Sequence, residues 1–250
     1  MEALVFVVFA FASLIGGFLL EDGVITALWG PTAALIVIGG TIGATGVSVR
    51  GANLKNVGKM ILIAFKGRKS ENQKIIDYFE DIAQRIRKEG GVLSIESEIS
   101  NQSVDKFIRD GLALVVDGTP AEKVREIMEG QVEQISHRHK ANLSMFEIAG
   151  GYAPTMGIIG TVMGLVHVLA DLSDPDALGQ KIAMAFLATL YGIASANLLY
   201  LPIAAKLKAI NAAEINEKYM IVEALASIAN ADSPTIISAK LKALNESKKR

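Results

Sequence analysis

Apolar and charged stretches alternate along the chain, and this alternation predicts its architecture. Four stretches are almost continuously apolar and contain no Asp, Glu, Lys or Arg: residues 3–20, 24–49, 148–170 and 182–205. A helix needs roughly 17 to 25 such residues to cross the hydrocarbon core of a membrane. The sequence therefore predicts four membrane-spanning helices, of which the first is close to the lower limit of length.

The segment between the second and third apolar stretches has the periodicity of amphipathic helices. One run covers residues 75–86 and stops before Gly90, and a second covers residues 104–115. A third helix is expected to begin at Pro120, a residue suited to the first turn, and to run towards the third span. Residues 215–229 form one more amphipathic stretch, and the chain then ends in charged residues. No alternating strand pattern is present, so the expected fold class is all-α, with four transmembrane helices and a helical cytoplasmic domain.

The expected division of the chain follows these stretches. Residues 1–50 hold the first two transmembrane helices, 51–147 a cytoplasmic helical domain, 148–205 the last two transmembrane helices, and 206–250 a cytoplasmic C-terminal helix and tail.

Basic residues predict the orientation in the membrane. The two short connections, residues 21–23 and 171–181, are acidic and contain one lysine between them. The segment after the second span is rich in basic residues: Arg50, Lys55, Lys59, Lys66, Arg68 and Lys69. Since basic residues stay on the cytoplasmic side, the long central segment, the tail and both termini are expected in the cytoplasm.

Composition excludes several classes of function. The chain is 51% hydrophobic with a mean hydropathy of +0.37, and its net charge of −1 does not suggest a nucleic-acid partner. It contains no cysteine, which excludes thiolate catalysis and cysteine-ligated metals. His137 and His139 are two residues apart on a predicted helix and face different ways, so no metal site is expected. No hydrolytic or nucleotide-binding pattern is present, so we expect neither an enzyme nor a cofactor.

Small residues form a continuous face on each of the last two spans. The third span carries Gly157, Gly160 or Thr161, and Gly164, and the fourth carries Ala185, Ala188 or Thr189, Gly192 and Ala196. Such faces allow membrane helices to approach closely, with threonine hydroxyls available for hydrogen bonds between helices. Each span also contains a proline, Pro154 or Pro202, which frees a backbone carbonyl and allows a hinge. Plain helix packing and reception of a partner helix with an ion both remain open.

These two spans resemble the paired third and fourth spans of the MotA family of flagellar stator proteins, within the MotA/TolQ/ExbB proton channel family. The resemblance rests on YAPTMGIIGTVMGLVHVL and DPDALGQKIAMAFLATLYGIASANLLYLPIAAKLK, and continues upstream in RKEGGVLSIE, FIRDGLALVVDGTP and REIMEGQVEQISHRHKANLSMFEIAGGYAPTMG. It covers essentially the whole chain. It implies a bacterial inner-membrane subunit that converts a transmembrane ion gradient into torque.

The resemblance also implies partners that supply what the spans lack. No span contains a carboxylate that could carry a proton. In the family this acid is an aspartate in the membrane helix of a MotB-type partner, whose other domain grips peptidoglycan. Five chains are expected around two partner chains, acting on the rotor protein FliG. The faces of Gly157, Gly160, Gly164 and Gly192 are then expected to line the ring interior and to receive the partner helix and the ion.

Individual residues take roles from the same resemblance. Thr161 and Thr189 match family positions in the ion pathway, near the partner aspartate. Sodium-driven relatives carry a further hydroxyl where this chain has Ala188, so the expected ion is H⁺, with Na⁺ as the alternative. Pro154 and Pro202 match prolines involved in torque generation, although each could simply bend or end a helix.

The resemblance also implies a rotor contact at Lys88, with Arg87 adjacent, and at Glu96. The alternative is that these residues form only a solvated helix end.

Rival functions remain. Energisers of the ExbB or TolQ type resemble this chain but have three spans. A self-contained channel or carrier would need its own ionisable group, and only His167 qualifies within the spans. A membrane enzyme is the most distant alternative, because the cytoplasmic segment offers no pairing of a nucleophile with a base.

Overall fold

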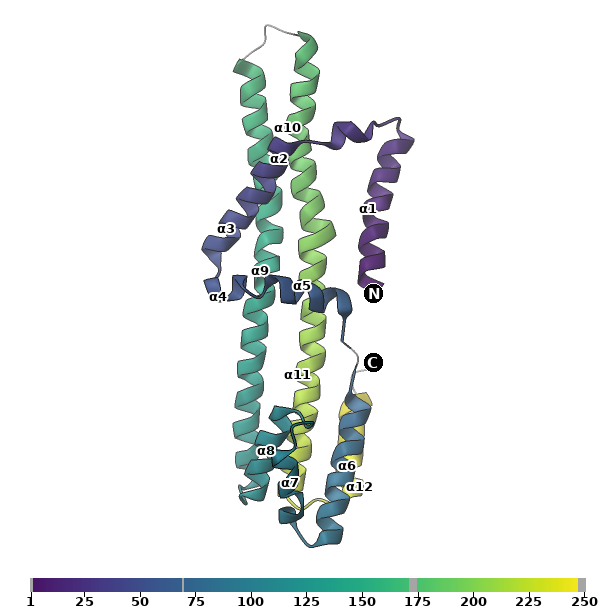
Figure 1. Cartoon of the computed structure of the whole chain (residues 1–250), viewed down its shortest axis with the longest axis vertical. Helices are drawn as coiled ribbons and strands as arrows, with labels where there is room; N and C mark the ends of the chain where they lie inside the picture. Colours follow the sequence, from purple (N-terminus) through teal and green to yellow (C-terminus); the bar gives the residue numbers. More distant parts are fainter. Residues whose placement is uncertain (1, 69, 171–174, 247–250) are drawn as a thin grey trace. The chain divides into compact units, whose positions relative to one another are not determined.

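The computed structural model of the chain describes residues 2–68, 70–170 and 175–246. Within these ranges every regular element is a helix, so the predicted all-α class is confirmed (Figure 1). The chain folds as two compact units. The first, here called the span unit, comprises Met1–Arg68 and Lys140–Ile210; the second, the helical unit, comprises Lys69–His139 and Asn211–Arg250. The units divide the chain at different positions from the ranges expected from sequence.

The span unit contains the four predicted membrane-spanning segments, which are confirmed by length and apolar composition. The first is α1 (Glu2–Leu20), and the second is built from η1 (Ile25–Leu28), α2 (Pro31–Ala34), the π-helical η2 (Leu35–Gly39) and α3 (Gly40–Ser48). The third is the end of α9 (Ala121–Ala170), and the fourth runs through α10 (Pro175–Ser195), the π-helical η4 (Ala196–Tyr200) and the start of α11 (Leu201–Ala229).

The second span differs from a single continuous helix because it breaks before Pro31. Gly30 there has a non-helical backbone with φ −135° and ψ 87°, and the helix proper begins with the proline at its first position. The Tyr191 hydroxyl from α10 covers this break: it donates to the Leu28 carbonyl and accepts from the Gly30 backbone N–H at 3.1 Å. Two backbone groups that the broken helix leaves open therefore find a partner inside the span unit.

Residues that follow the second span pack with the spans. α4 (Gly51–Leu54) and α5 (Val57–Lys66) come next. Ala64 of α5 is buried in a cluster with Leu143 and Phe146 of α9 and with Ile203 and Leu207 of α11. The expected cytoplasmic range that begins at residue 51 is thus divided, since its first part belongs to the span unit.

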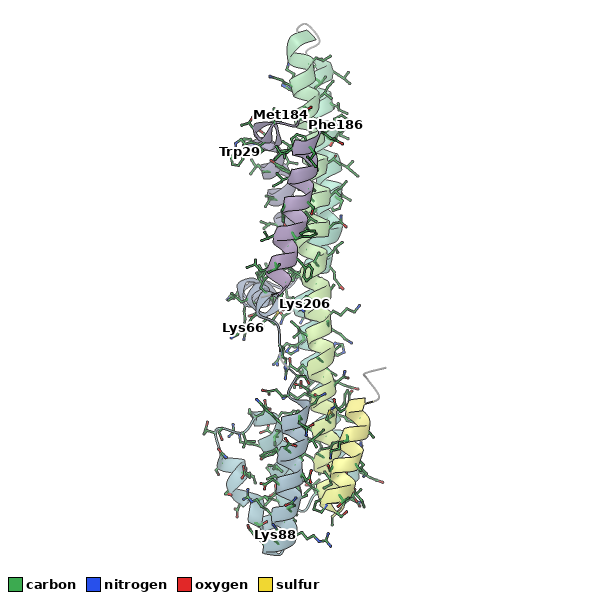
Figure 2. All side chains as sticks on the ribbon, turned by 90° about the vertical axis from the view of Figure 1, so that its right-hand side faces the viewer. Trp29, Lys66, Lys88, Met184, Phe186 and Lys206 are labelled. Carbon is green, nitrogen blue, oxygen red and sulfur yellow. The ribbon has the colours of Figure 1, made fainter. Side chains whose placement is uncertain are left out.

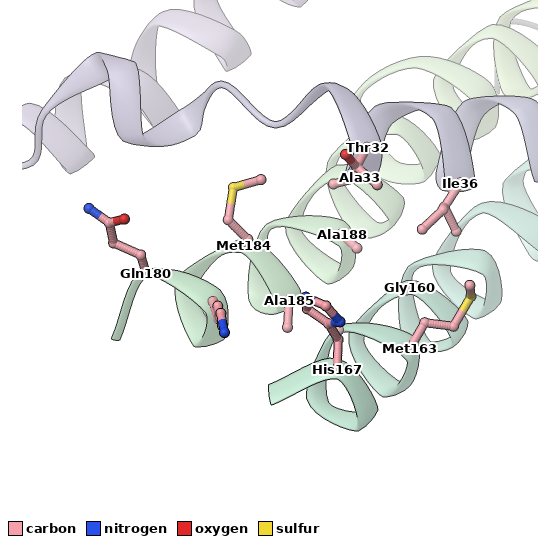
Figure 3. Close-up of a pocket in the computed structure, with 12 residues that line it drawn as sticks. Thr32, Ala33, Ile36, Gly160, Met163, His167, Gln180, Met184, Ala185 and Ala188 are labelled. Atoms are coloured by element: carbon pink, nitrogen blue, oxygen red, sulfur yellow. The ribbon is translucent and has the colours of Figure 1, made fainter. Parts of the chain in front are cut away.

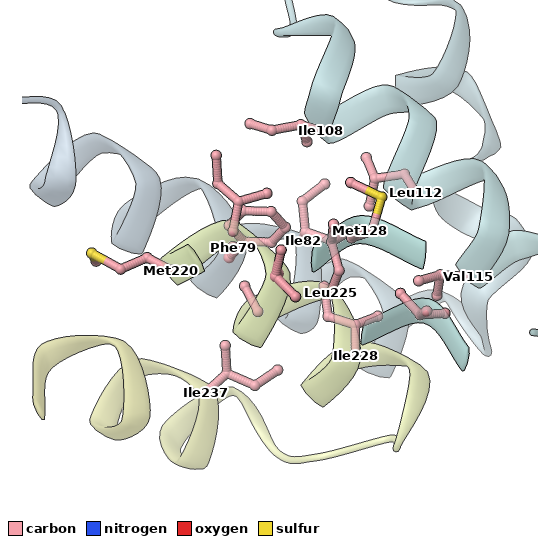
Figure 4. Close-up of a cluster of buried hydrophobic side chains, with 14 of the residues drawn as sticks. Phe79, Ile82, Ile108, Leu112, Val115, Met128, Met220, Leu225, Ile228 and Ile237 are labelled. Atoms are coloured by element: carbon pink, nitrogen blue, oxygen red, sulfur yellow. The ribbon is translucent and has the colours of Figure 1, made fainter. Parts of the chain in front are cut away.

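The helical unit is held together by one apolar core (Figure 4). Its elements are α6 (Asn72–Glu89), η3 (Val92–Ile95), α7 (Glu96–Ser100), α8 (Lys106–Val116), the beginning of α9, the end of α11, and α12 (Pro234–Glu246). The core contains Phe79, Leu112, Met128, Leu225 and Ile237 from five of these helices. α6 ends as predicted, because Gly90 adopts a left-handed conformation with φ 85°.

α9 confirms one prediction from the sequence, and α12 corrects another. α9 continues from Ala121 to Ala170 without a break, so the third helix predicted between the second and third spans does run into the third span. Beyond α11, however, the chain does not simply end in solvated charge. α12 follows it and buries Ile237 and Leu241 in the core, with 1% and 0% of their surface exposed.

Candidate functional site

The third and fourth spans meet backbone to backbone along their small-residue faces. A Cβ atom added to Gly157 of α9 would lie 2.9 Å from the Ala188 carbonyl oxygen and 3.0 Å from the Thr189 Cα of α10. A Cβ on Gly164 would lie 2.6 Å from the Cβ of Ala185. Real Cβ atoms do not tolerate such distances to backbone, so these helices can approach this closely only with glycine.

The glycine faces are therefore occupied within the chain. Gly157, Gly160 and Gly192 are buried and Gly164 is half-buried, each against the neighbouring span. The structure assigns these four glycines to helix packing. This agrees with the helix-packing alternative, and the reception of a partner helix beside these faces stays a prediction.

Two threonines bring hydroxyl groups together inside this seam. The hydroxyl oxygens of Thr161 on α9 and Thr189 on α10 are hydrogen-bonded to each other. Thr161 Oγ1 also lies 3.1 Å from the Gly157 carbonyl oxygen of its own helix and 3.0 Å from the Ala185 carbonyl oxygen of α10. Thr189 Oγ1 lies 3.4 Å from the Gly157 carbonyl oxygen. Four oxygen atoms, two hydroxyl and two carbonyl, thus converge between the spans.

The cluster contains more hydrogen-bond acceptors than hydrogens to donate. Each hydroxyl carries one hydrogen, so Thr161 donates to only one of its three acceptors at a time. The cluster therefore keeps unused acceptor positions for a donor from outside the chain. Both threonines are half-buried, so the cluster is not sealed inside the protein. None of its members is an acid or a base that carries a proton by itself.

Ala188 lies beside the threonines and faces a different neighbour. It is 2% exposed and packs in a small apolar cluster with Ala33 and Val37 of the second span and with Leu187. A Cβ on Gly160 would come within 2.6 Å of the Ala188 Cβ. A larger side chain at position 188 would press against α9 and the second span before it reached the hydroxyl cluster.

Pro154 and Pro202 lie inside continuous helices, at neighbouring levels of the span unit. Pro154 lies inside α9 and is half-buried, and Pro202 is the exposed second residue of α11, directly after the π-helical η4. Gly150, four residues before Pro154, would place a Cβ 2.8 Å from the Cγ of Leu201. Each proline removes one backbone hydrogen-bond donor from its helix. The two helices therefore each lack a backbone hydrogen bond close to the contact between Gly150 and Leu201.

His167 belongs to neither the glycine seam nor the threonine cluster. It is exposed and lines a groove together with residues of the second and fourth spans (Figure 3). His139, in the helical unit, lies with its Nδ1 atom 3.0 Å from the Asn211 side-chain oxygen. Within the described ranges no group of three or more His, Cys, Asp or Glu could hold a metal ion.

The residues expected at the rotor contact lie around the end of α6, in the helical unit. Arg87 and Lys88 occupy its last turn, Glu96 opens α7, and all three side chains are exposed (Figure 2 labels Lys88). Lys88 and Glu96 form no ion pair with any residue of the part of the chain that the structure describes. Both charges are therefore available to a partner.

Sequence reasoning missed the contact that supports this end of the unit. Arg85 of α6 forms an ion pair at 2.6 Å with Glu98 of α7, and the Tyr78 hydroxyl donates to the same carboxylate at 3.4 Å. Burial and then Glu98 raise the pKa of Tyr78, and the hydrogen bond to Glu98 raises the pKa of Arg85. The signal in the sequence was an Arg and a Glu on either side of a glycine turn, which by itself does not identify a pair.

The sequence matches known protein families along nearly the whole chain. Residues 4–90 match the motility protein A N-terminal family, and residues 99–220 match the MotA/TolQ/ExbB proton channel family. The chain is 36% identical over 240 residues to motility protein A of Bacillus subtilis, covering 96% of this chain and 88% of that protein. This chain belongs to the MotA/TolQ/ExbB proton channel family.

Solved structures of this family have the same fold. A chain in the structure of C. jejuni MotAB gives a TM-score of 0.90 at 30% identity, covering 97% of this chain and 94% of that one. A chain in the flagellar MotAB stator complex from Bacillus subtilis gives 0.88 at 37% identity, covering 95% and 93%. The family consists of membrane ion-channel subunits and is not an enzyme family. The motility and stator names of these relatives favour the flagellar reading over an energiser of the ExbB or TolQ type.

Proposed function

We propose that this chain is the membrane-embedded stator subunit of a bacterial flagellar motor, which with a MotB-type partner converts an ion gradient into torque. The observation that carries the proposal is the hydroxyl cluster of Thr161 and Thr189, set between two glycine-packed spans of a chain whose four spans contain no carboxylate. The cluster can accept hydrogen bonds, but a proton-carrying acid has to come from a second protein.

The partner is proposed to insert one aspartate-bearing membrane helix beside this cluster. The similarity to chains solved as MotAB complexes supports such a partner. We further propose a ring of five copies around two partner chains, with the exposed Lys88 and Glu96 acting on the rotor protein FliG. Surface ion pairs are individually worth about 0 to 1 kcal/mol, which suits a contact that must form and break repeatedly.

H⁺ is the proposed ion. A proton needs only the partner carboxylate and a polar path, whereas Na⁺ needs several oxygen ligands to replace its water. At the position where an extra hydroxyl would stand, this chain has Ala188, buried against the second span. One charge that crosses 100 mV releases about 2.3 kcal/mol, enough to shift helices hinged at prolines between states of similar energy.

The proposed orientation places both termini in the cytoplasm of a bacterial inner membrane. Lys66 and Lys206 lie towards one end of the span unit, and Trp29 lies towards the other (Figure 2). Basic residues favour the cytoplasmic side, and tryptophan is enriched at the membrane–water interface. The lysine-bearing end is therefore assigned to the cytoplasm.

Motility of a strain that lacks its own stator genes tests the proposed function. Expression of this chain with its MotB-type partner should restore swimming, and expression of either protein alone should not. Normal membrane levels of both proteins with flagella that stay paralysed would contradict the stator role.

A further inference from the structure

A groove on the span unit lies between α1, α5 and the fourth span, and is here called the α1 groove. α1 packs against α5 and against η4 of the fourth span, and a volume of about 360 Å³ remains between them. Its walls are mostly apolar, with Phe6 and Ala10 of α1, Ala64 of α5, and Leu198 and Ile203 of the fourth span among them. The α1 groove thus offers a long apolar surface at the outer side of the fourth span.

The two ends of the α1 groove differ in polarity. At one end Asn197 donates through Nδ2 to the Ile193 carbonyl of its own helix at 2.9 Å. At the other end stands Lys206, which is exposed. Lys66, the last residue of α5, is also exposed and lies towards the same end of the span unit (Figure 2). Within the part of the chain that the structure describes, neither ammonium group forms an ion pair or a hydrogen bond, so both are available.

The other charges at this end of the span unit are mostly basic. α5 packs here in one cluster with α9 and α11, and α1 begins beside α5. The acids in these segments are Glu2 and Glu147. The bases are Arg50, Lys55, Lys59, Lys66, Arg68, Lys140, Lys206 and Lys208. The acidic connections, residues 21–23 and 171–181, follow the far ends of α1 and α9. The charge at this end therefore remains positive when both acids are counted.

Lys206 also marks the level of the membrane surface. It directly follows the apolar stretch of residues 182–205, so its ammonium group lies where the fourth span leaves the hydrocarbon. From Lys206 the α1 groove follows the span inward to Asn197, over roughly 13 Å at a rise of about 1.5 Å per residue. A cationic end at the surface and apolar walls leading inward match the charge and shape of a phospholipid.

We propose that the α1 groove binds a phospholipid with an anionic head group, whose phosphate meets Lys206 and Lys66 and whose acyl chain lies along Phe6 and Ala10. Hydrogen bonds from ammonium to phosphate are among the strong charge-assisted ones, and basic pockets between membrane helices favour such head groups. A second copy of this chain fits the site less well, because it presents the same excess of basic residues at this level. The proposal does not depend on the stator role.

Native mass spectrometry of the chain, in the assembly that purifies from membranes in detergent, tests this binding. Phosphatidylglycerol and zwitterionic phosphatidylcholine are added separately, and the retained lipid is counted. Phosphatidylglycerol should bind preferentially, and Lys206→Gln should weaken its binding about fivefold, the effect expected of one basic residue at an anionic membrane surface. Lys208→Gln removes an exposed lysine of the same helix that does not line the groove, and this control should change nothing. Equal retention of the two lipids, or equal effects of the two lysine variants, would overturn the proposal.

A second pair of variants tests the acyl channel without touching a charge. Ala10 of α1 lines the groove, whereas Ala12 of the same helix is exposed and does not line it. Ala10→Phe should fill the channel and reduce the retention of phosphatidylglycerol, and Ala12→Phe should leave it unchanged. If Ala10→Phe instead splits the assembly into single chains and leaves lipid retention intact, the groove is a contact between subunits and the proposal is wrong.

Discussion

Gly192 of α10 faces Gly157 of α9 so closely that a Cβ on Gly192 would lie 3.1 Å from the Gly157 Cα and 2.5 Å from the Ala153 carbonyl oxygen. This contact sets the separation of the third and fourth spans. Because Thr161 and Thr189 lie four and three residues from these glycines on their helices, the same contact brings their hydroxyls into hydrogen-bonding distance. Packing and the candidate ion site are therefore linked through two glycines.

Substitution of Gly192 tests that link. Gly192→Ala should force the two spans apart, at a cost of about 1 to 3 kcal/mol for an overpacked site, and should lower both thermal stability in detergent and motor torque. Gly151→Ala is the matched control, since a Cβ at this glycine of α9 meets nothing within 4 Å. Helix propensity should then raise stability by up to about 1 kcal/mol. Equal melting temperatures for the two variants would refute the packing role.

Substitution of the two span prolines is expected to lower torque without lowering stability. Pro154→Ala and Pro202→Ala each return a backbone N–H donor to a span, so both variants should assemble at normal levels and melt no lower than the native chain. Torque, measured as the rotation speed of tethered cells, should fall sharply because the restored hydrogen bond stiffens the position at which each span could hinge. Pro120→Ala provides the control, as this proline precedes α9 and breaks no helical hydrogen bond. Wild-type speed in both span variants would leave the prolines with a structural role alone.

Reversal of the exposed charges near the end of α6 is expected to abolish torque and to leave assembly intact. Reversal of both signs in the double variant Lys88→Glu, Glu96→Lys should abolish rotation while the protein still reaches the membrane. The control is Lys123→Glu with Glu126→Lys, which exchanges the ends of an exposed 2.7 Å ion pair and preserves it. Unimpaired swimming of the Lys88–Glu96 reversal would remove these residues from the rotor contact.

The contacts of Asp105 predict that the stability of the helical unit depends on pH. Its carboxylate caps α8 and pairs at 3.0 Å with Lys218, whose ammonium lies 4.6 Å from the centre of the Phe107 ring. Burial acts to raise the pKa of Asp105, but the hydrogen bond and charge of Lys218 outweigh it and lower the pKa. A carboxyl whose pKa is lower in the folded state than its unfolded pKa of about 3.9 stabilises the folded protein at pH values above that unfolded pKa. This contribution to stability is lost as the pH falls through the folded pKa.

Asp105→Asn isolates this charge, because asparagine still caps a helix. At pH 7 the variant should lose about 1 kcal/mol or less, since the carboxylate is half-exposed and partly screened by water. Amide exchange of α8, compared between variant and native chain at each pH, should show the difference shrinking between about pH 5 and pH 3. Asp117→Asn, at the other end of α8, is the control. A difference that persists unchanged into acid would contradict the assignment.

The elements that sequence could predict are those encoded by local periodicity. Long apolar runs defined the four spans, and the run from Pro120 onward defined the continuous α9. α12 was missed because only Ile237 and Leu241 mark its buried face among lysines. The ion pair of Arg85 with Glu98 and the facing of Thr161 and Thr189 depend on how helices are paired and rotated. No single helix encodes that arrangement, so the sequence left open whether the glycine faces pack within the chain or receive a partner helix.

Proton flux into liposomes tests the central claim most directly. The claim is that this chain supplies a packed pair of spans with a hydroxyl cluster, and that a partner supplies the acid. Liposomes that contain the chain with its MotB-type partner should acidify when a membrane potential is imposed, and liposomes that contain the chain alone, at equal density, should remain at baseline. Flux of equal size through the chain alone would contradict the account.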